Sequence, residues 1–251
     1  MASEFRAGDA MALDIGVGWL AHWSRTLDAD EFKEQAAIFV RLNEVLVAAK
    51  MRPHEEPLDI AEKDVFETRV GSAQMLHAVR RLAAFVALRQ RLPTPDEREL
   101  TPTADPALTR FYKAHKTYCE LVNDYPVLTR VLRFGRPGPR YAHLVWHSDA
   151  EGFYLPRDFR EVVMDLSGIE RGVGGMVGSS VRLLDECSEL ARLIGLPADI
   201  DMDAEELWEA GERPRTDGAP WEAFGPEAFC LVRLIHGCKE SLRLNSVLAF
   251  G

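Results

Sequence analysis

The spacing of apolar residues predicts helices along most of the chain. The residues Phe32, Ala36, Phe39, Val40, Leu46 and Val47 share one helical face, which predicts a helix over about 30–50. Asp28 and Glu31 stand three residues apart at its start, in the spacing of a capping box. Similar stripes, with a cap at Asp105 before Pro106, predict further helices at about 71–91, 106–123, 181–194 and 226–243.

A polar turn between two apolar, aromatic runs predicts a β-hairpin in the second half of the chain. The segments 141–147 and 153–155 are rich in apolar and aromatic residues, and they flank the polar turn 148–152. We expect two further strands at 162–165 and 245–250. The Gly- and Pro-rich break at 135–139 separates this part from an all-helical first half.

These elements predict a predominantly helical α+β fold. A helical layer from 11–134 packs on a small antiparallel sheet that includes the 141–155 hairpin and a C-terminal strand. Residues 1–10 form a flexible N-terminus, and 11–251 form a single compact domain, with the sheet and remaining helices in 140–251. A fraction of 47% hydrophobic residues is enough for a sizeable core.

The charge balance limits the classes of partner. The chain holds 30 Lys and Arg against 40 Asp and Glu, a net charge of -10. A general nucleic-acid binder needs a basic face, so that class is excluded. The balance favours a protein partner, and a basic one in particular.

The cysteines and the hydropathy pattern predict a cytoplasmic location. The four cysteines are widely spaced and include no C-x-x-C pair, which is typical of reduced thiols. We expect no secretory signal, because the start lacks a basic region followed by an apolar run. No uncharged apolar window is long enough for a transmembrane helix, so we expect no membrane association. The oligomeric state is not predicted.

The predicted hairpin carries one set of candidate catalytic residues. On a strand, His143 and His147 would lie about 13 Å apart, too far to share a metal. His147 and Asp149 would lie about 7 Å apart on one face, where they could share a metal with a third group or form an acid–base pair. The structural alternative is that Asp149 builds the turn while His147 is buried. A hydrolase-like enzyme would use His147 and Asp149 with Tyr154 and Arg157; no metal ligand set and no cofactor is predicted.

A glycine-rich run before a predicted helix is a candidate anion or nucleotide site. Free backbone N–H groups at a helix start attract anions. The run has no Gly-Lys-Ser/Thr and misses G-x-G-x-x-G, so the alternative is a flexible approach with Ser179 or Ser180 as the N-cap. The candidate ligand-binding residues are Gly174, Gly175, Gly178, Ser179 and Ser180.

An acidic stretch is the candidate partner-binding surface. Residues 185–222 hold 12 acidic and 3 basic residues, a net charge of -9. The run from Asp199 resembles a calcium loop but has Ala204 and Ala210 where such a loop needs Gly and Glu. We expect Asp203 instead to cap a short helix, with Glu206 reaching back. The candidate partner-binding residues are Asp199, Asp201, Asp203, Glu205, Glu206 and Glu209.

Three segments carry a resemblance to a known family. They read HLVWHSDAEGFYLPRDF at 143–159, GSSVRLLDE at 178–186 and AFG at the C-terminus. The chain resembles a family of conserved, uncharacterised bacterial proteins, largely actinobacterial. The resemblance implies a bacterial cytoplasmic location and supplies no activity, cofactor or catalytic residue.

The sequence favours a non-enzymatic interaction or regulatory protein, immunity-like in character, that binds a partner through its acidic surface. The net charge, the acidic stretch and the lack of a diagnostic catalytic motif support this hypothesis. Two alternatives stay open: a small enzyme at His147 and Asp149, and an anion-binding module at 172–180.

Overall fold

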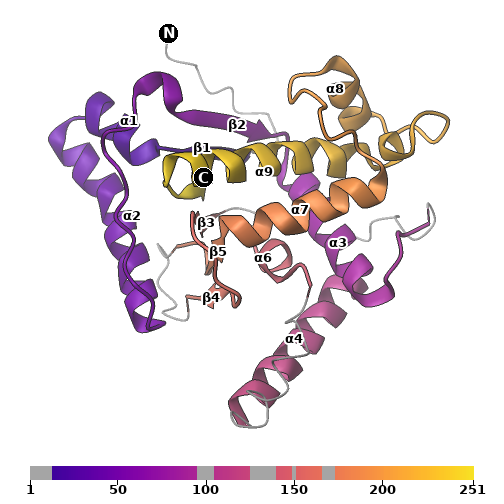
Figure 1. Ribbon diagram of the computed structural model, residues 1–251, viewed down its shortest axis with the longest axis horizontal. Helices are drawn as coiled ribbons and strands as arrows, with labels where there is room; N and C mark the ends of the chain where they lie inside the picture. Colours follow the sequence, from indigo (N-terminus) through magenta and orange to yellow (C-terminus); the bar gives the residue numbers. More distant parts are fainter. Residues whose placement is uncertain (1–12, 95–104, 125–139, 149–150, 166–172) are drawn as a thin grey trace.

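The protein is an α+β structure in which helices cover both faces of one sheet (Figure 1). The computed structural model describes residues 13–94, 105–124, 140–148, 151–165 and 173–251. The predicted fold class, mostly helical α+β, is confirmed. The α-helices are α1 (Trp19–Thr26), α2 (Ala29–Ala48), α3 (Ala73–Arg89), α4 (Pro106–Asp124), α6 (Ala142–Val145), α7 (Ser180–Ile194), α8 (Glu205–Glu212) and α9 (Gly225–Leu244), and the short 3-10 helices are η1 (Glu62–Asp64) and η3 (Pro220–Phe224).

The sheet has six strands in the order β2-β1-β6-β3-β5-β4. Strands β3 and β5 pair in parallel, and the other neighbours pair antiparallel, so the sheet is mixed where we predicted an antiparallel one. The predicted C-terminal strand is confirmed and lies between β1 and β3. The strands are β1 (Leu13–Val17), β2 (Phe66–Val70), β3 (Gly152–Leu155), β4 (Val163–Met164), β5 (Met176–Ser179) and β6 (Leu248–Phe250).

The two faces of the sheet belong to two separate hydrophobic clusters. Successive side chains of a strand point to opposite faces, and β6 shows the consequence: Leu248 and Phe250 join the cluster beneath α3, α7 and α9, while Ala249 joins the cluster beneath α1 and α2. Figure 1 shows α2 at one side of the molecule and α8 at the other, above α7 and α9.

Local sequence signals account for the starts of α2, α4 and α7. Asp28 accepts from the backbone N–H of Asp30 and Glu31 and completes the predicted capping box at α2. Asp105 accepts from the N–H of Ala107 and Leu108 at α4, as predicted. The Ser179 side chain accepts from the Arg182 N–H at α7, which confirms the predicted N-cap. Each of these caps satisfies N–H groups that a helix leaves unpaired.

The first arm of the predicted hairpin is wrong, because residues 142–145 form helix α6. The N–H groups of His143 and Leu144 donate to the Glu186 carboxylate at 3.2 and 2.8 Å. This contact joins residues more than forty positions apart in the sequence, so the local residue pattern of 141–147 could not reveal it. The second arm is confirmed as β3, which pairs with β5 and β6 instead of with residues 141–147.

Strands β1, β2 and β5 come from segments for which the sequence analysis names no strand. The sequence of 14–23 fits either a short strand or the first turns of a helix, and we favoured the helix; residues 13–17 form β1, and α1 follows only after Gly18, whose φ is 86°. Strand β2 pairs with β1 along its full length. The first part of the chain therefore contributes strands as well as helices. The predicted break at 135–139 and residues 1–10 lie outside the described residues.

No helix in the described part of the chain is both long enough and apolar enough to cross a membrane.

Candidate functional site

The acidic segment, residues 199–212, lies at the surface around α8 (Figure 1). It holds seven Asp or Glu and no Lys, Arg or His. All seven acidic side chains are exposed: Asp199, Asp201, Asp203, Glu205, Glu206, Glu209 and Glu212. Six of them are the predicted partner-binding residues, and the structure brings these six together on one loop and one helix.

The start of α8 differs from the prediction. Its N-cap is Ala204, and no side chain caps it. The Asp201 carboxylate instead accepts from the Asp203 N–H at 2.8 Å and forms a turn before the helix. Asp203 and Glu206 are thus left without the capping role that we expected, and both stay at the surface.

Close packing on α9 fixes the position of α8. Leu207 is fully buried, and Gly211 lies against the Phe229 ring, where an added Cβ would come within 3.3 Å. Gly225 at the start of α9 is closer still, because a Cβ there would lie 1.7 Å from the Ala210 carbonyl oxygen. A surface that stands on such a rigid element keeps its geometry when a partner binds.

The acidic side chains of α8 form a stripe along the helix. Glu205, Glu209 and Glu212 are spaced i, i+4 and i+7, which places them on one face. Leu207 and Ala210 occupy the opposite, buried face. The helix therefore presents a row of carboxylates outward.

These carboxylates are not neutralised by neighbouring cations. Within the described residues, no basic nitrogen lies within 4.0 Å of any carboxylate of the acidic segment. Carboxylates elsewhere are paired: Glu62 with Arg25, and Asp158 with Arg182. In this part of the chain, seven carboxylates without a close ion-pair partner therefore face solvent, and the Asp203 and Asp201 charges also act on nearby basic groups, Arg233 and His236.

An aromatic and a buried cation lie beside this charge. Trp208 of α8 is 45% exposed and meets Phe229 edge-on, with ring centroids 4.7 Å apart. The Arg233 guanidinium is buried with its carbon 4.9 Å from the Trp208 ring centroid and 3.4 Å from that of Phe229. Burial lowers the pKa of Arg233 to about 10, against the opposing effect of the Asp203 charge. Our sequence analysis missed both residues, although Trp208 was recognisable as an aromatic side chain within an acidic run.

Two of the candidate catalytic residues of 147–157, His147 and Tyr154, are buried, and Arg157 is half-buried. His147 and Tyr154 are at most 1% exposed, and their rings stack with centroids 5.6 Å apart. The Tyr154 hydroxyl donates to the His143 carbonyl at 2.8 Å, and the Arg157 guanidinium donates to the Arg52 carbonyl at 2.6 Å. Asp149 lies outside the described residues. His147 and Tyr154 thus present no reactive atom to solvent, and the catalytic role stays a prediction.

His143 and Glu186 complete this buried polar cluster, which we define as His143, His147, Tyr154 and Glu186. His143 accepts from the Ser179 N–H through Nδ1 and donates to the Arg160 carbonyl through Nε2. Burial lowers the pKa of His143 to about 4 and raises the pKa of Glu186 to about 8. Both groups favour their neutral forms and connect α6 to the sheet and α7. Within the described residues, no group of three or more His, Cys, Asp or Glu side chains could hold a metal ion.

The glycine-rich candidate site is occupied by the protein's own backbone and side chains. Gly174 has a φ of 72°, and a Cβ there would lie 2.5 Å from the Glu151 backbone. A Cβ at Gly178 would meet the Tyr154 ring at 2.3 Å. The Ser179 N–H donates to His143, and the Ser180 hydroxyl bonds with Ser241 at 2.8 Å. Gly175 is the exposed residue of this set, and anion binding here stays a prediction.

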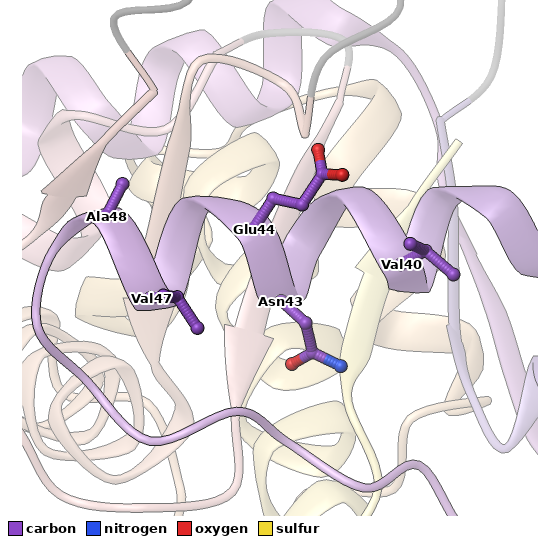
Figure 2. A pocket seen from close by; sticks show the side chains of 5 residues that line it. All are labelled: Val40, Asn43, Glu44, Val47 and Ala48. Atoms are coloured by element: carbon purple, nitrogen blue, oxygen red, sulfur yellow. The ribbon is translucent and has the colours of Figure 1, made fainter.

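A shallow groove lies on α2 (Figure 2). It has a volume of about 560 Å³ and is lined by Val40, Asn43, Glu44, Val47 and Ala48. Asn43 is already used, because its amide bonds with the backbone of His54 in both directions. The groove lacks a charged cluster or reactive group beyond Glu44, which pairs with Arg41.

The geometry defines an α+β protein with a rigid, unpaired acidic helix at its surface and a buried polar cluster in its interior. The chain belongs to the family described as "Putative DNA-mimic protein", whose model matches residues 11–250. Searches of curated proteins and of solved structures gave no match. The family match covers the first two segments of the resemblance noted above and the third except Gly251.

The family corrects the expected partner. We predicted a protein partner of unspecified kind that is basic. A DNA mimic, by the description of the family, addresses proteins that bind DNA, so the generic partner is wrong. The family also favours a role in protein interaction over a role in catalysis.

Proposed function

We propose that the protein is a non-enzymatic DNA mimic that binds the DNA-binding face of a DNA-binding protein through its acidic segment. The observation that carries this proposal is the row of exposed carboxylates on α8, none of them paired with a basic nitrogen within the described residues. The family of the chain supports it independently.

The density of charge on α8 supports mimicry of a DNA strand. The helix carries four glutamates in eight residues. Eight helical residues span about 12 Å, which gives roughly one charge per 3 Å of axis. One strand of B-DNA carries a charge about every 3.4 Å. A protein surface that reads phosphates through Lys and Arg would meet a similar density on α8.

The mechanism that follows is competitive. A partner whose basic face binds the acidic segment cannot place the same face on phosphates. Because the attraction is between exposed charges, it speeds association and weakens as salt rises. We place this activity in the cytoplasm of a bacterial host, in line with the resemblance of the chain and its widely spaced cysteines.

Displacement of DNA tests this proposal. Proteins of the host retained on DNA-cellulose are mixed with a labelled 30-base-pair duplex, and the chain is titrated into the mixture. A matched variant carries Asn or Gln at all seven acidic positions of the segment. We expect the wild-type chain to release the duplex from at least one protein of the fraction, and the variant to need at least about 100-fold more protein.

The control is a variant with three neutralised acidic residues outside the segment, Glu34→Gln, Glu44→Gln and Glu67→Gln. It should displace DNA nearly as well as the wild type, because its changes leave α8 intact. Equal displacement by the wild type and the seven-fold variant would refute the acidic segment as the DNA-like surface.

A further inference from the structure

Trp208 is the one aromatic side chain among the large hydrophobic residues that the described part of the chain leaves well exposed. The others are the aliphatic Val40, Val47, Leu58, Leu88 and Met164. A tryptophan in water leaves a large apolar area unburied, and tryptophan is enriched among the residues that dominate binding interfaces.

Trp208 lies beside two glutamates of the acidic stripe on α8. Trp208 stands three residues after Glu205 and four residues before Glu212, so both glutamates are its neighbours on the helix surface. A side chain that approaches the ring from solvent therefore enters the field of two carboxylates. That field favours a cation.

The ring is held in place from below. Phe229 meets it edge-on at 4.7 Å, and the Arg233 guanidinium lies 4.9 Å from its centroid. Both partners belong to α9, to which α8 is fixed by the close approach of Gly225 to Ala210. Ordering the ring on binding thus costs little conformational entropy.

Among the basic side chains, the guanidinium group of arginine is the best ligand for the Trp208 ring and its neighbouring carboxylates. It stacks on aromatic rings and is more weakly hydrated than ammonium, so it leaves water at a lower free-energy cost. Its planar donors can also reach a carboxylate beside the ring. Arg233 already provides one such contact with this ring from inside the protein.

We propose that Trp208 is the aromatic anchor of the acidic surface and receives an arginine side chain from the DNA-binding partner. Glu205 and Glu212 flank the arginine. This inference rests on the proposed function and adds a selectivity: the surface prefers arginine over lysine at this point, although the two carry equal charge.

Two short peptides test the preference without knowledge of the partner. Labelled hexa-arginine and hexa-lysine are titrated with the full chain, and binding is followed by fluorescence anisotropy at low salt. We expect hexa-arginine to bind about fivefold more tightly, as for a cation–π contact of about 1 kcal/mol. The Trp208→Leu variant should lose this preference while its affinity for hexa-lysine stays unchanged. Val47→Ala, which shortens a remote exposed side chain, should keep the preference.

Each outcome bears on one proposal. A preference that survives in Trp208→Leu, or one absent from the wild type, overturns the anchor. An equal loss of both peptides in Trp208→Leu also overturns it, because Trp208 would then only support the fold of α8. If the seven-fold acidic variant binds both peptides as the wild type does, the proposed function itself fails.

Discussion

The acidic segment and the buried polar cluster contain similar residue types in opposite settings. The carboxylates of 199–212 are exposed and unpaired with basic nitrogens within the described residues, whereas Glu186 lies under α6 and accepts two backbone N–H groups. Trp208 is 45% exposed, whereas Tyr154 is fully buried and donates its hydroxyl to the protein. Polar groups that the fold already satisfies stabilise it, and those left in solvent are free to bind a partner.

Because of this difference, we expect substitutions in one region to affect stability and substitutions in the other to affect binding. Changes in the buried polar cluster should lower the free energy of unfolding and leave the acidic surface intact. Changes in the acidic segment should abolish binding and leave the free energy of unfolding nearly unchanged.

The largest effect on stability is expected for Tyr154→Ala. The substitution removes a fully buried ring and leaves the His143 carbonyl without its donor. We expect the free energy of unfolding to fall by about 4 kcal/mol. Urea denaturation followed by circular dichroism measures this loss. Tyr154→Phe, which keeps the ring, should lose only about 1–2 kcal/mol, and equal losses in the two variants would contradict the importance of the ring.

A smaller effect is expected from the pH dependence of Glu186. In the folded protein its pKa is about 8 against an ordinary value of 4.5. Between these values the folded state keeps a proton that the unfolded state has lost, so stability falls as pH rises. His143, with its pKa lowered from 6.5 to about 4, has the opposite effect below pH 6.5. His115 and His236, whose pKa values burial also lowers, act in the same sense as His143, and all three effects fade above pH 6.5. Towards pH 8 the ionisation of Glu186 therefore dominates, with a slope of at most about 1.4 kcal/mol per pH unit.

Glu186→Gln tests this assignment. The variant cannot ionise, so its stability should lack the fall that ionisation of Glu186 causes in the wild type between pH 6.5 and 8. Thermal melts of both proteins across this range measure the difference. An equal pH dependence of the two proteins would contradict the neutral form of Glu186.

The smallest effect on stability is expected for the seven-fold acidic variant. Removing like charges that repel each other should change the free energy of unfolding by less than about 1 kcal/mol, with a small gain at low salt. Urea denaturation at two salt concentrations measures this change. A loss of several kcal/mol would show that the carboxylates support the fold, and the separation of the two regions would then fail.

The sequence predicted the elements whose signals are local. The N-caps and apolar stripes of α2, α4 and α7 involve residues within one or two turns, and the structure confirms these helices. The acidic segment was predicted for the same reason, because a run of carboxylates is exposed in almost any fold. Glu186 and α6 were not predictable, since the contact that forms this helix joins residues more than forty positions apart.

The candidate sites, too, could be predicted only where their properties depend on residues close in sequence. His147, Asp149, Tyr154 and Arg157 could form a catalytic site only if their side chains reach solvent. Whether His147 and Tyr154 do so depends on the packing of β6 and α6 around them, which the local sequence does not show. The significance of Trp208 depends on Phe229 and Arg233 of α9, which lie more than twenty residues away.

The most direct test of the account is whether the chain and duplex DNA exclude each other on one partner. A protein recovered by the displacement experiment is titrated with the labelled chain at rising concentrations of a 30-base-pair duplex. The account predicts that the apparent Kd of the chain rises in proportion to the duplex concentration, without a plateau. A ternary complex of chain, partner and duplex, seen as a plateau in the apparent Kd, would contradict DNA mimicry by the acidic segment.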